Sequence, residues 1–284
     1  MGTMGVRVVS GESAGARWEM AQRPIPARLR GVVRSWCGYV ERTTGPSVRD
    51  ELPIPELVLI FELGPPIRVA GVTNQGGFVG MVEPAPTRCE HDGYQAGVQV
   101  NLTPIGARRI FAMPLSELAG RIVGVGDVLA RSDRTLSQRL GEASTWDARF
   151  DLVEHALLAR LDASRIDLRT TAWALDRIHA RQGALSIAEL SGALGYSHKH
   201  VITLFRDHVG IAPKAYAAIV RFDALVRHLR SPGRGSWSAL AHRFGFSDQA
   251  HLAREVRRHA GMTATALRAR IASDRFVLDP DPEG

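Results

Sequence analysis

Apolar residues recur at intervals of three to four positions in two stretches near the C-terminal end of the chain. Two stripes share this spacing: Ile187, Leu190 and Leu194, and then Trp237, Leu240 and Phe244. The spacing places the apolar side chains on one face of a helix. The pattern therefore predicts two amphipathic helices, each with a small core beneath it.

The two stretches also repeat each other residue by residue. The segment Leu-Ser-Gly-Ala-Leu-Gly-Tyr-Ser at 190–197 aligns with Leu-Ala-His-Arg-Phe-Gly-Phe-Ser at 240–247, an offset of 50. Beyond the serines the offset becomes 51, which pairs Phe205 with Val256 and Gly210 with Gly261. The second copy therefore carries one extra residue, near the start of a helix.

A sharp turn and a second helix are predicted after each stripe. Gly195 and Gly245 stand where the chain must turn, and glycine reaches a positive φ there without steric cost. Ser197 and Ser247 follow, where a serine caps a helix by accepting a hydrogen bond from a free N–H group. Each copy thus reads as helix, turn and helix.

We predict two helix-turn-helix units, over residues 185–213 and 237–264. A capping box formed by Ser186 and Glu189 opens the first unit. Between the units, residues 214–229 form one long helix that begins at Pro213. In such units the second helix enters the major groove of DNA and presents its first turns to the base edges.

These residues resemble the AraC/XylS family of bacterial transcription regulators. The matching segments are 187–190 (Ile-Ala-Glu-Leu), 195–197, 205–206, 210–213, 245–252 (Gly-Phe-Ser-Asp-Gln-Ala-His-Leu) and 261–263. Arg221, Ala224 and Leu225 also fall where the family's linker helix carries an arginine and small or apolar residues. Val256 and Ala264 depart from the phenylalanine and proline usual there. The resemblance covers about a hundred residues and implies DNA binding.

The distribution of charge favours the same function. Residues 170–275 hold 16 Lys and Arg against 7 Asp and Glu, whereas residues 1–169 hold 20 against 19. Contacts with phosphates supply most non-specific affinity for DNA, so a basic half beside a nearly neutral half is typical of a DNA-binding protein. A basic surface that only aids solubility is the alternative.

Particular residues are candidates for contact with DNA. The first predicted recognition helix offers His198, Lys199, His200, Thr203 and Arg206, and the second offers Asp248, Gln249, His251 and Arg254. Glutamine pairs with adenine, lysine and arginine with guanine, and aspartate accepts from cytosine. Arg257 and Arg258 are predicted to contact phosphates. For each residue, an ordinary solvated helix face is the alternative.

No metal site, cofactor or catalytic residue is predicted. His198 and His200 diverge in a helix because they are two residues apart, and no cysteine or carboxylate completes a ligand set. The β-rich region offers one histidine, His91, beside Glu90 and Asp92, so a metal enzyme is not expected. We therefore assign His198 and His200 to contact with the DNA groove.

The N-terminal part is predicted to be β-rich and then helical. Apolar or alternating runs at 57–61, 78–82 and 97–102, separated by Pro and Gly, indicate antiparallel strands of a small barrel. From Leu115 onward the pattern is helical, with a stripe at Leu152, Ala156, Leu157 and Leu161. The AraC/XylS resemblance implies a cupin-like barrel that binds an effector or mediates dimerisation.

The predicted class is therefore α+β, with an all-α domain at the C-terminal end. Residues 1–165 form the β-rich domain, 166–275 the DNA-binding domain, and 276–284 an acidic tail. The effector and its site stay open, because Trp36, Phe61, Phe78 and Arg88 suit a pocket as well as a core and a surface. Two cysteines, Cys37 and Cys89, fit a reducing compartment, although a disulfide between them stays an alternative.

The predicted function is a sequence-specific transcription regulator controlled by a small molecule. Its partners would be double-stranded DNA, RNA polymerase, an unknown effector and a second copy of the chain. A cytoplasmic location is expected, since no apolar run spans a bilayer and the N-terminus lacks the apolar stretch of a signal peptide. The alternative is a small-molecule-binding or catalytic N-terminal domain with a non-specific nucleic-acid tether.

Overall fold

The N-terminal half is built from two antiparallel sheets. The computed structural model describes residues 5–13, 15–73, 75–129, 134–231 and 235–273. The larger sheet has the order β1 (Arg7–Ser13), β2 (Ala16–Gln22), β3 (Val33–Thr43), β10 (Tyr94–Leu102), β5 (Leu57–Glu62), β8 (Gly77–Gly80) and β11 (Ile122–Gly124). The smaller sheet has the order β4 (Ser47–Glu51), β9 (Thr87–His91), β6 (Arg68–Val69) and β7 (Val72–Thr73).

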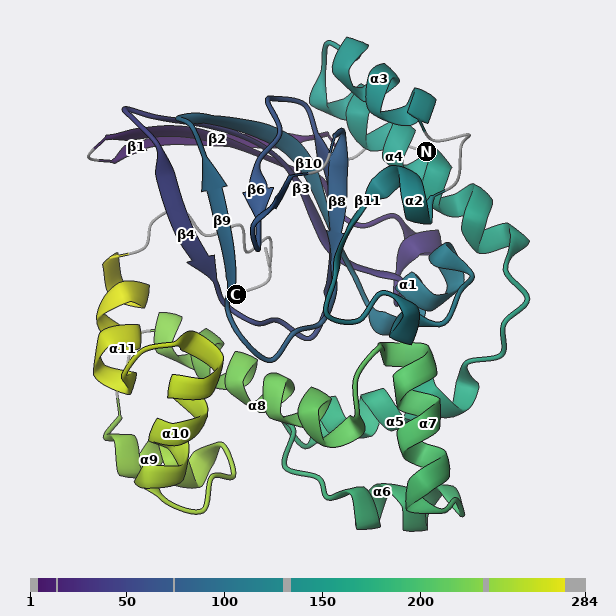
Figure 1. Cartoon of the computed structure of the whole chain (residues 1–284), viewed down its shortest axis with the longest axis vertical. Helices are drawn as coiled ribbons and strands as arrows, with labels where there is room; N and C mark the ends of the chain where they lie inside the picture. Colours follow the sequence, from purple (N-terminus) through teal and green to yellow (C-terminus); the bar gives the residue numbers. More distant parts are fainter. Residues whose placement is uncertain (1–4, 14, 74, 130–133, 232–234, 274–284) are drawn as a thin grey trace.

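These sheets confirm the predicted α+β class, but they do not close into the predicted barrel. The three predicted strands are β5, β8 and β10, and all the strand pairs are antiparallel. Within the described residues, β1 and β11 end the larger sheet without pairing to each other, and β4 and β7 end the smaller one. The sheets face each other as an open sandwich (Figure 1).

Both faces of the central strands β5 and β10 of the larger sheet are buried, and the two faces differ in chemistry. On β10, Val98 and Val100 point into the main hydrophobic core, whereas Gln95, Gln99 and Asn101 line the space between the sheets. On β5, Leu59 belongs to the same main core and Ile60 to the space between the sheets. A strand buried on both faces reads as a continuous apolar run, which is the pattern at 57–61.

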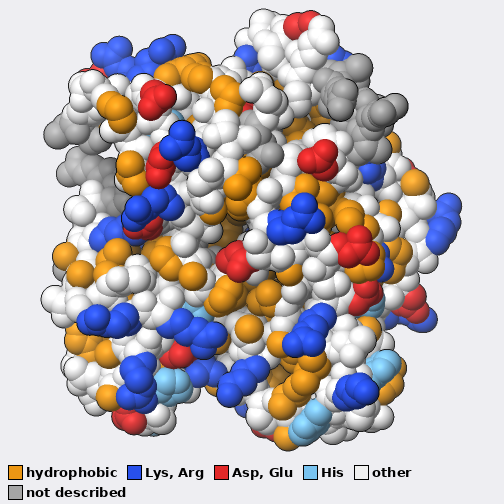
Figure 2. Space-filling model, in the orientation of Figure 1, with side chains coloured by type: hydrophobic (Ala, Val, Ile, Leu, Met, Phe, Trp, Pro, Cys, Tyr) orange, Lys and Arg blue, Asp and Glu red, His pale blue; other side chains and the backbone are white. Residues whose placement is uncertain are grey.

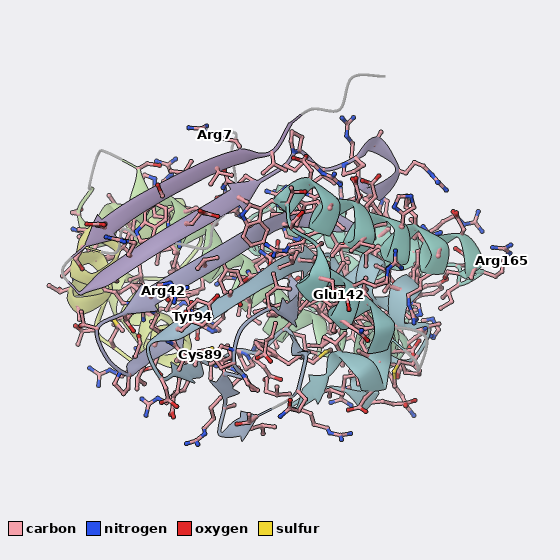
Figure 3. All side chains as sticks on the ribbon, turned by 90° about the horizontal axis from the view of Figure 1, so that it is seen from above. Arg7, Arg42, Cys89, Tyr94, Glu142 and Arg165 are labelled. Atoms are coloured by element: carbon pink, nitrogen blue, oxygen red, sulfur yellow. The ribbon has the colours of Figure 1, made fainter. Side chains whose placement is uncertain are left out.

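Helices cover the outer face of the larger sheet. They are α1 (Pro104–Phe111), α2 (Val125–Val128), α3 (Arg134–Glu142) and α4 (Trp146–Ala163), with 3-10 turns η1 (Ala27–Leu29) and η2 (Leu115–Glu117). Phe150, Val153 and Leu157 on one face of α4 are fully buried. Figure 3 shows α4, which lies between the labelled Glu142 and Arg165, alongside the strands.

The C-terminal half is helical, as predicted. Its helices are α5 (Arg169–Ala180), α6 (Ile187–Leu194), α7 (His198–Val209), α8 (Pro213–Arg230), α9 (Trp237–Arg243), α10 (Gln249–Ala260) and α11 (Ala264–Ser273). The long helix predicted at 214–229 is α8, which runs beneath the sandwich with α5–α7 at one end and α9–α11 at the other (Figure 1).

Of the predicted domain limits, the boundary at residue 165 falls in a segment that the structure describes, and the tail at 276–284 does not. Residues 164–168 lie outside helices between α4 and α5, at the predicted boundary, but the main core continues across this point from Leu161 to Ala174. The boundary at 165 therefore stays a prediction, and the tail at 276–284 lies outside the described residues. Cys37 and Cys89 are both free thiols. Among the described helices, none is long and apolar enough to cross a membrane.

Candidate DNA-binding surface

The first helix-turn-helix unit has the caps that its sequence predicts. Ser186 Oγ accepts from the N–H of Glu189 at 3.1 Å, and the Glu189 carboxylate accepts from the N–H of Ser186 at 2.8 Å. Gly195 ends α6 at φ 70°. Ser197 Oγ then accepts from the N–H of His200 at 3.2 Å and opens α7. The tight turn thus follows from local chemistry.

The second unit departs from the prediction at its recognition helix. Gly245 turns at φ 71°, but the cap of α10 is Asp248 and not Ser247. Asp248 Oδ1 accepts from the N–H of His251 at 2.6 Å, and Ser247 Oγ donates to Asp248 Oδ2 at 3.2 Å. The prediction for Ser247 was wrong because the extra residue of the second copy moves the cap one position along the chain.

A histidine rests on the aromatic residue of the turn in both units. The rings of Tyr196 and His200 are 4.5 Å apart, and those of Phe246 and His251 are 5.5 Å apart, both edge to face. His251 Nδ1 also accepts from the N–H of Ser247 at 3.2 Å. The two histidines therefore occupy equivalent places, where they brace the start of each recognition helix.

Almost all the predicted contact residues are exposed to solvent. His251 is half-buried, and the others are exposed: His198, Lys199, His200, Thr203, Arg206, Asp248, Gln249, Arg254, Arg257 and Arg258. In Figure 2, Lys, Arg and His side chains gather along the lower part of the molecule, over both ends of the helical half. These side chains are thus accessible to a partner on the side away from the sheets.

The opposite ends of both recognition helices are fastened to the sandwich. Near the end of α7, Asp207 pairs with Arg108 of α1 at 3.4 Å. Near the end of α10, His259 is fully buried and its Nδ1 lies 2.6 Å from the backbone oxygen of Pro84. Burial is the main reason that the pKa of His259 is lowered. Because a backbone oxygen can only accept, Nδ1 donates to it.

Arg221 of α8 contacts both units at once. Its Nη2 donates to the backbone oxygen of Gly183 at 2.8 Å, just before the first unit. Its guanidinium lies 5.4 Å from the ring of Phe246, in the turn of the second unit. The linker helix therefore positions the two units through this side chain as well as through its own length.

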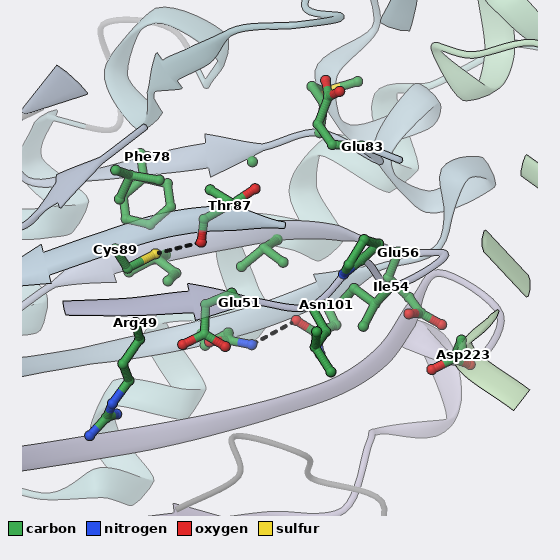
Figure 4. A pocket seen from close by; sticks show the side chains of 18 of the residues that line it. Arg49, Glu51, Ile54, Glu56, Phe78, Glu83, Thr87, Cys89, Asn101 and Asp223 are labelled. Carbon is green, nitrogen blue, oxygen red and sulfur yellow. Dashed lines mark hydrogen bonds between the residues drawn. The ribbon is translucent and has the colours of Figure 1, made fainter. Parts of the chain in front are cut away.

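A second candidate site lies between the sheets, as a cavity of about 260 Å³ that extends to α8 and α11. Its apolar lining consists of Val58, Ile60, Ile67, Val69, Phe78 and Ile122. Figure 4 shows Phe78 and Cys89 at one end and Asp223 of α8 at the other, close to Ile54 and Glu56. The cavity is thus shared between the sandwich and the linker helix.

Neutral polar groups line the cavity beside these apolar residues, since Gln99 pairs with Ile60 and Asn101 with Val58 on the neighbouring strands β10 and β5. Gln99 Nε2 donates to Asn101 Oδ1 at 2.9 Å, and Asn101 Nδ2 donates to Ser35 Oγ at 3.0 Å. All three residues line the cavity and belong to adjacent strands, β3 and β10. A ligand here would meet amide and hydroxyl groups next to hydrocarbon.

Several charged groups around the cavity already have partners. Burial raises the pKa of Glu41, but hydrogen bonds from His91, Gln95 and Arg49 outweigh it and bring the value to about 2. Arg227 pairs with Asp223 at 2.8 Å, and Arg270 Nη2 donates to the backbone oxygen of Asp50 at 2.7 Å. The charges of these side chains are therefore balanced by partners within the protein before any ligand binds.

Residues 190–270 match a protein-family model described as a helix-turn-helix domain. The matched segment runs from α6 to α11 and includes both turns and the linker helix. The matched segment is thus an AraC-type helix-turn-helix domain.

No curated protein matches the chain. Among solved structures, ToxT from Vibrio cholerae is similar, with 8% identity, a TM-score of 0.45 and coverage of 83% of this chain and 98% of ToxT. ToxT bound to (E)-4-(8-methylnaphthalen-1-yl)but-3-enoic acid has 7% identity, a TM-score of 0.45 and coverage of 80% and 94%. Unsaturated fatty acid bound wild-type ToxT has 8% identity, a TM-score of 0.43 and coverage of 80% and 96%.

The structure brings the predicted contact residues onto two separate helices, α7 and α10, but it gives Asp248 a structural task. Both carboxylate oxygens of Asp248 accept hydrogen bonds within its own turn. Sequence reasoning missed the cavity, because its wall alternates with core residues along β10 and joins strands distant in the chain. The alternation of Val with Gln and Asn at 98–101 was the available signal.

Proposed function

We propose that this protein is a sequence-specific regulator that reads two successive major grooves with α7 and α10. The two grooves lie about 34 Å apart, one turn of the double helix, so a single protomer recognises an asymmetric two-part site. The observation that supports this most is the repeated arrangement of cap, turn and exposed first helical turn at Ser197 and Asp248.

The base contacts are assigned to exposed side chains that have no capping task. In this proposal exposed Lys199 in α7 contacts guanine and exposed Gln249 in α10 contacts adenine. Arg257 and Arg258, exposed farther along α10, contact phosphates. His200 and His251 support the helix starts through their aromatic neighbours, and their edges contact DNA from there.

Selection of genomic DNA fragments by the full chain, at two salt concentrations, tests the function. A two-part motif, with two protected patches one turn apart in a footprint, is the expected result. Affinity should fall steeply as salt rises because bound phosphates release counterions. Salt-sensitive binding without any motif would favour a non-specific tether, and a footprint confined to one groove would contradict the two-groove arrangement.

Single substitutions then separate base contacts from phosphate contacts. Gln249→Ala is expected to relax one base position of the motif at a cost of about 1–3 kcal/mol. Arg258→Ala is the matched control, since it should weaken binding uniformly across sequences and reduce the salt dependence. Uniform weakening by Gln249→Ala would reassign this side chain to the DNA backbone.

We also propose that a small molecule controls the regulator from the cavity between the sheets. The apolar lining with its neutral polar patch suits an uncharged molecule with one polar edge, because burying an additional unpaired charge there would be costly. Gly80 offers a way to block the site. It lines the cavity, and a Cβ built on it would meet only Val58 atoms, at 3.9–4.0 Å, so the backbone tolerates a side chain.

Thermal unfolding of the wild type and the Gly80→Phe variant, against the same library of uncharged metabolites, tests this control. A ligand of the cavity should raise the melting temperature of the wild type and leave the variant unaffected, since binding to the native state stabilises it. A ligand that stabilises both proteins equally would bind elsewhere.

A further inference from the structure

The hydrophobic core of the molecule divides inside α8, and the division separates the two helix-turn-helix units. One continuous core contains the sandwich, the first unit and the part of α8 up to Val220. A second core begins at Phe222 and contains the rest of α8 with α9, α10 and α11. The first unit is therefore packed as part of the sandwich, whereas the second has its own core.

The first unit meets the sandwich through apolar packing. Phe205 and Val209 of α7 are fully buried in the same core as Leu115 of η2. A Cβ built on Gly210, which ends α7, would lie 3.0 Å from Met81 and 3.4 Å from the backbone oxygen of Leu115. Such close packing resists a change in the relative position of the two parts.

The second unit meets the sandwich mainly through polar contacts. Arg270 of α11 donates to the backbone oxygen of Asp50, and His259 of α10 to that of Pro84. Among the described residues of the sandwich, Leu52 alone packs against the core of the second unit, and it is only partly buried. A few hydrogen bonds and one apolar contact cost less to rearrange than a shared core.

The cavity lies at this weaker contact. Its lining from the helical half consists of Asp223, Val226, Arg227 and Arg230 of α8 and Arg270 and Ile271 of α11, all beyond the point at which the core divides. Within the described residues, none of its lining comes from α5, α6 or α7. A molecule in the cavity would touch the sandwich on one side and the second unit on the other.

We propose that the ligand of this cavity sets the position of the second helix-turn-helix unit alone, while the first unit stays fixed to the sandwich. This inference rests on the proposed function. A ligand shifts such an equilibrium only by its difference in affinity for the two positions, and contacts on both sides of a movable joint provide that difference. The effector then controls how well the second half of the DNA site is read.

Binding to divided DNA sites tests the proposal with the full chain. Gly80→Phe serves as a permanent occupant of the cavity, and Val72→Phe adds the same ring at an exposed position of β7 outside it. The two half-sites are first identified by which base positions respond to Lys199→Ala and Gln249→Ala. Affinity is then measured for the intact site and for a site with the second half scrambled.

Gly80→Phe is expected to change the affinity for the intact site by at least about fivefold, the lower end of typical coupling between sites. The affinity for the site with only the first half intact should stay within about twofold of the wild type, and Val72→Phe should alter neither. Equal changes at both sites, or no change at the intact site, would overturn the proposal. If the wild type shows no two-part preference, the proposed function itself fails.

Hydrogen exchange provides a test that does not depend on DNA. Arg270→Met removes the hydrogen bond to Asp50 and keeps the length of the side chain. Faster amide exchange confined to α9–α11, with α5–α7 exchanging at the rate of the sandwich, is the expected result. Faster exchange in α5–α7 to the same degree would show that the two units move together, and would contradict the inference even if Gly80→Phe failed to fold.

Discussion

Gly245, in the turn of the second unit, lies against Ala184, just before the first unit. A Cβ built on Gly245 would be 2.9 Å from the Cβ of Ala184, closer than such atoms approach in proteins. Arg221 reinforces the same junction through Gly183. The two helix-turn-helix units thus touch directly at Gly245, and any change in the position of the second unit must accommodate this contact.

Substitution of Gly245 is expected to act in two separable ways. Gly245→Ala should destabilise the fold by about 1–2 kcal/mol through the positive φ alone, and the contact with Ala184 should add to this loss. The double variant Ala184→Gly/Gly245→Ala should recover the second part only. Urea unfolding of the four proteins in a double-mutant cycle measures the coupling, and a coupling energy near zero would mean that the loop at 184 yields freely.

The cap of α10 predicts a specific order of stability among three variants. Asp248→Ala should lower the melting temperature and the protection of the first amides of α10, because the N–H of His251 loses its acceptor. Asp248→Asn should retain most of the stability, since asparagine also caps helices well. Ser247→Ala is the control and should change little. A larger loss of stability for Ser247→Ala than for Asp248→Ala would mean that Ser247 caps the helix, as the sequence predicted.

The cap also predicts a dependence on pH. Hydrogen bonds, chiefly from the N–H of His251, lower the pKa of Asp248. A lowered pKa in the folded state contributes stability that is present above the pKa of the unfolded chain and is lost as the pH falls through the folded value. The stability advantage of the wild type over Asp248→Asn should therefore shrink in acid, as unfolding curves between pH 6 and acid would show.

Local patterns carried most of what could be predicted about the helical half. The spacing of Leu190 and Leu194, the glycine at 195 and the cap at Ser197 act within a few residues, so the sequence displays them directly. The cap at Asp248 was missed because a one-residue shift exchanges two neighbours that both cap helices well. Which side chains contact bases stays a prediction, since exposure alone does not decide it.

The sandwich was less predictable because its pairings join distant parts of the chain. Neighbours β3 and β10 are separated by 50 residues and six other strands, and no local signal records that order. The short strands β6 and β7, with two residues each, have no periodic pattern to detect. The cavity depends on these pairings, so Ser35 and Asn101 could not be connected from their sequence positions.

Glu62 on β5 predicts a pH dependence of the opposite sign. Burial raises its pKa to about 7, against the hydrogen bond that it accepts from the N–H of Ile67. Because the pKa is raised in the folded state, the contribution of Glu62 to the stability of the fold is complete below the ordinary pKa of a glutamate. This contribution is lost as the pH rises through about 7. The carboxyl group is therefore most compatible with the fold when it is protonated.

The Glu62→Gln variant isolates this effect. It should match the wild type near pH 5 and exceed its stability near pH 8 by about 1–2 kcal/mol, less than the full value of the shift because solvent screens part of it. The buried histidines titrate equally in both proteins, so the difference between the two urea unfolding curves reports Glu62. An identical pH profile for the two proteins would show that Glu62 ionises without cost.

The division of the core predicts that two similar truncations have unlike consequences. Phe205 and Leu252 are both fully buried in recognition helices, but Phe205 belongs to the core shared with the sandwich and Leu252 to the separate core. Phe205→Ala should cost about 3–5 kcal/mol and Leu252→Ala about 2–5 kcal/mol. Phe205→Ala should lower the stability of the sandwich and the first unit together.

Leu252→Ala should instead open α9–α11 at a urea concentration at which the sandwich and α5–α7 are still folded. Amide exchange measured along a urea series distinguishes the two cases, because each cooperative unit shows its own dependence on denaturant. If all helices lost protection at one urea concentration in both variants, the two units would unfold as one cooperative unit joined through α8. In that case the second unit could not move independently, since its detachment from the sandwich would unfold the first unit as well.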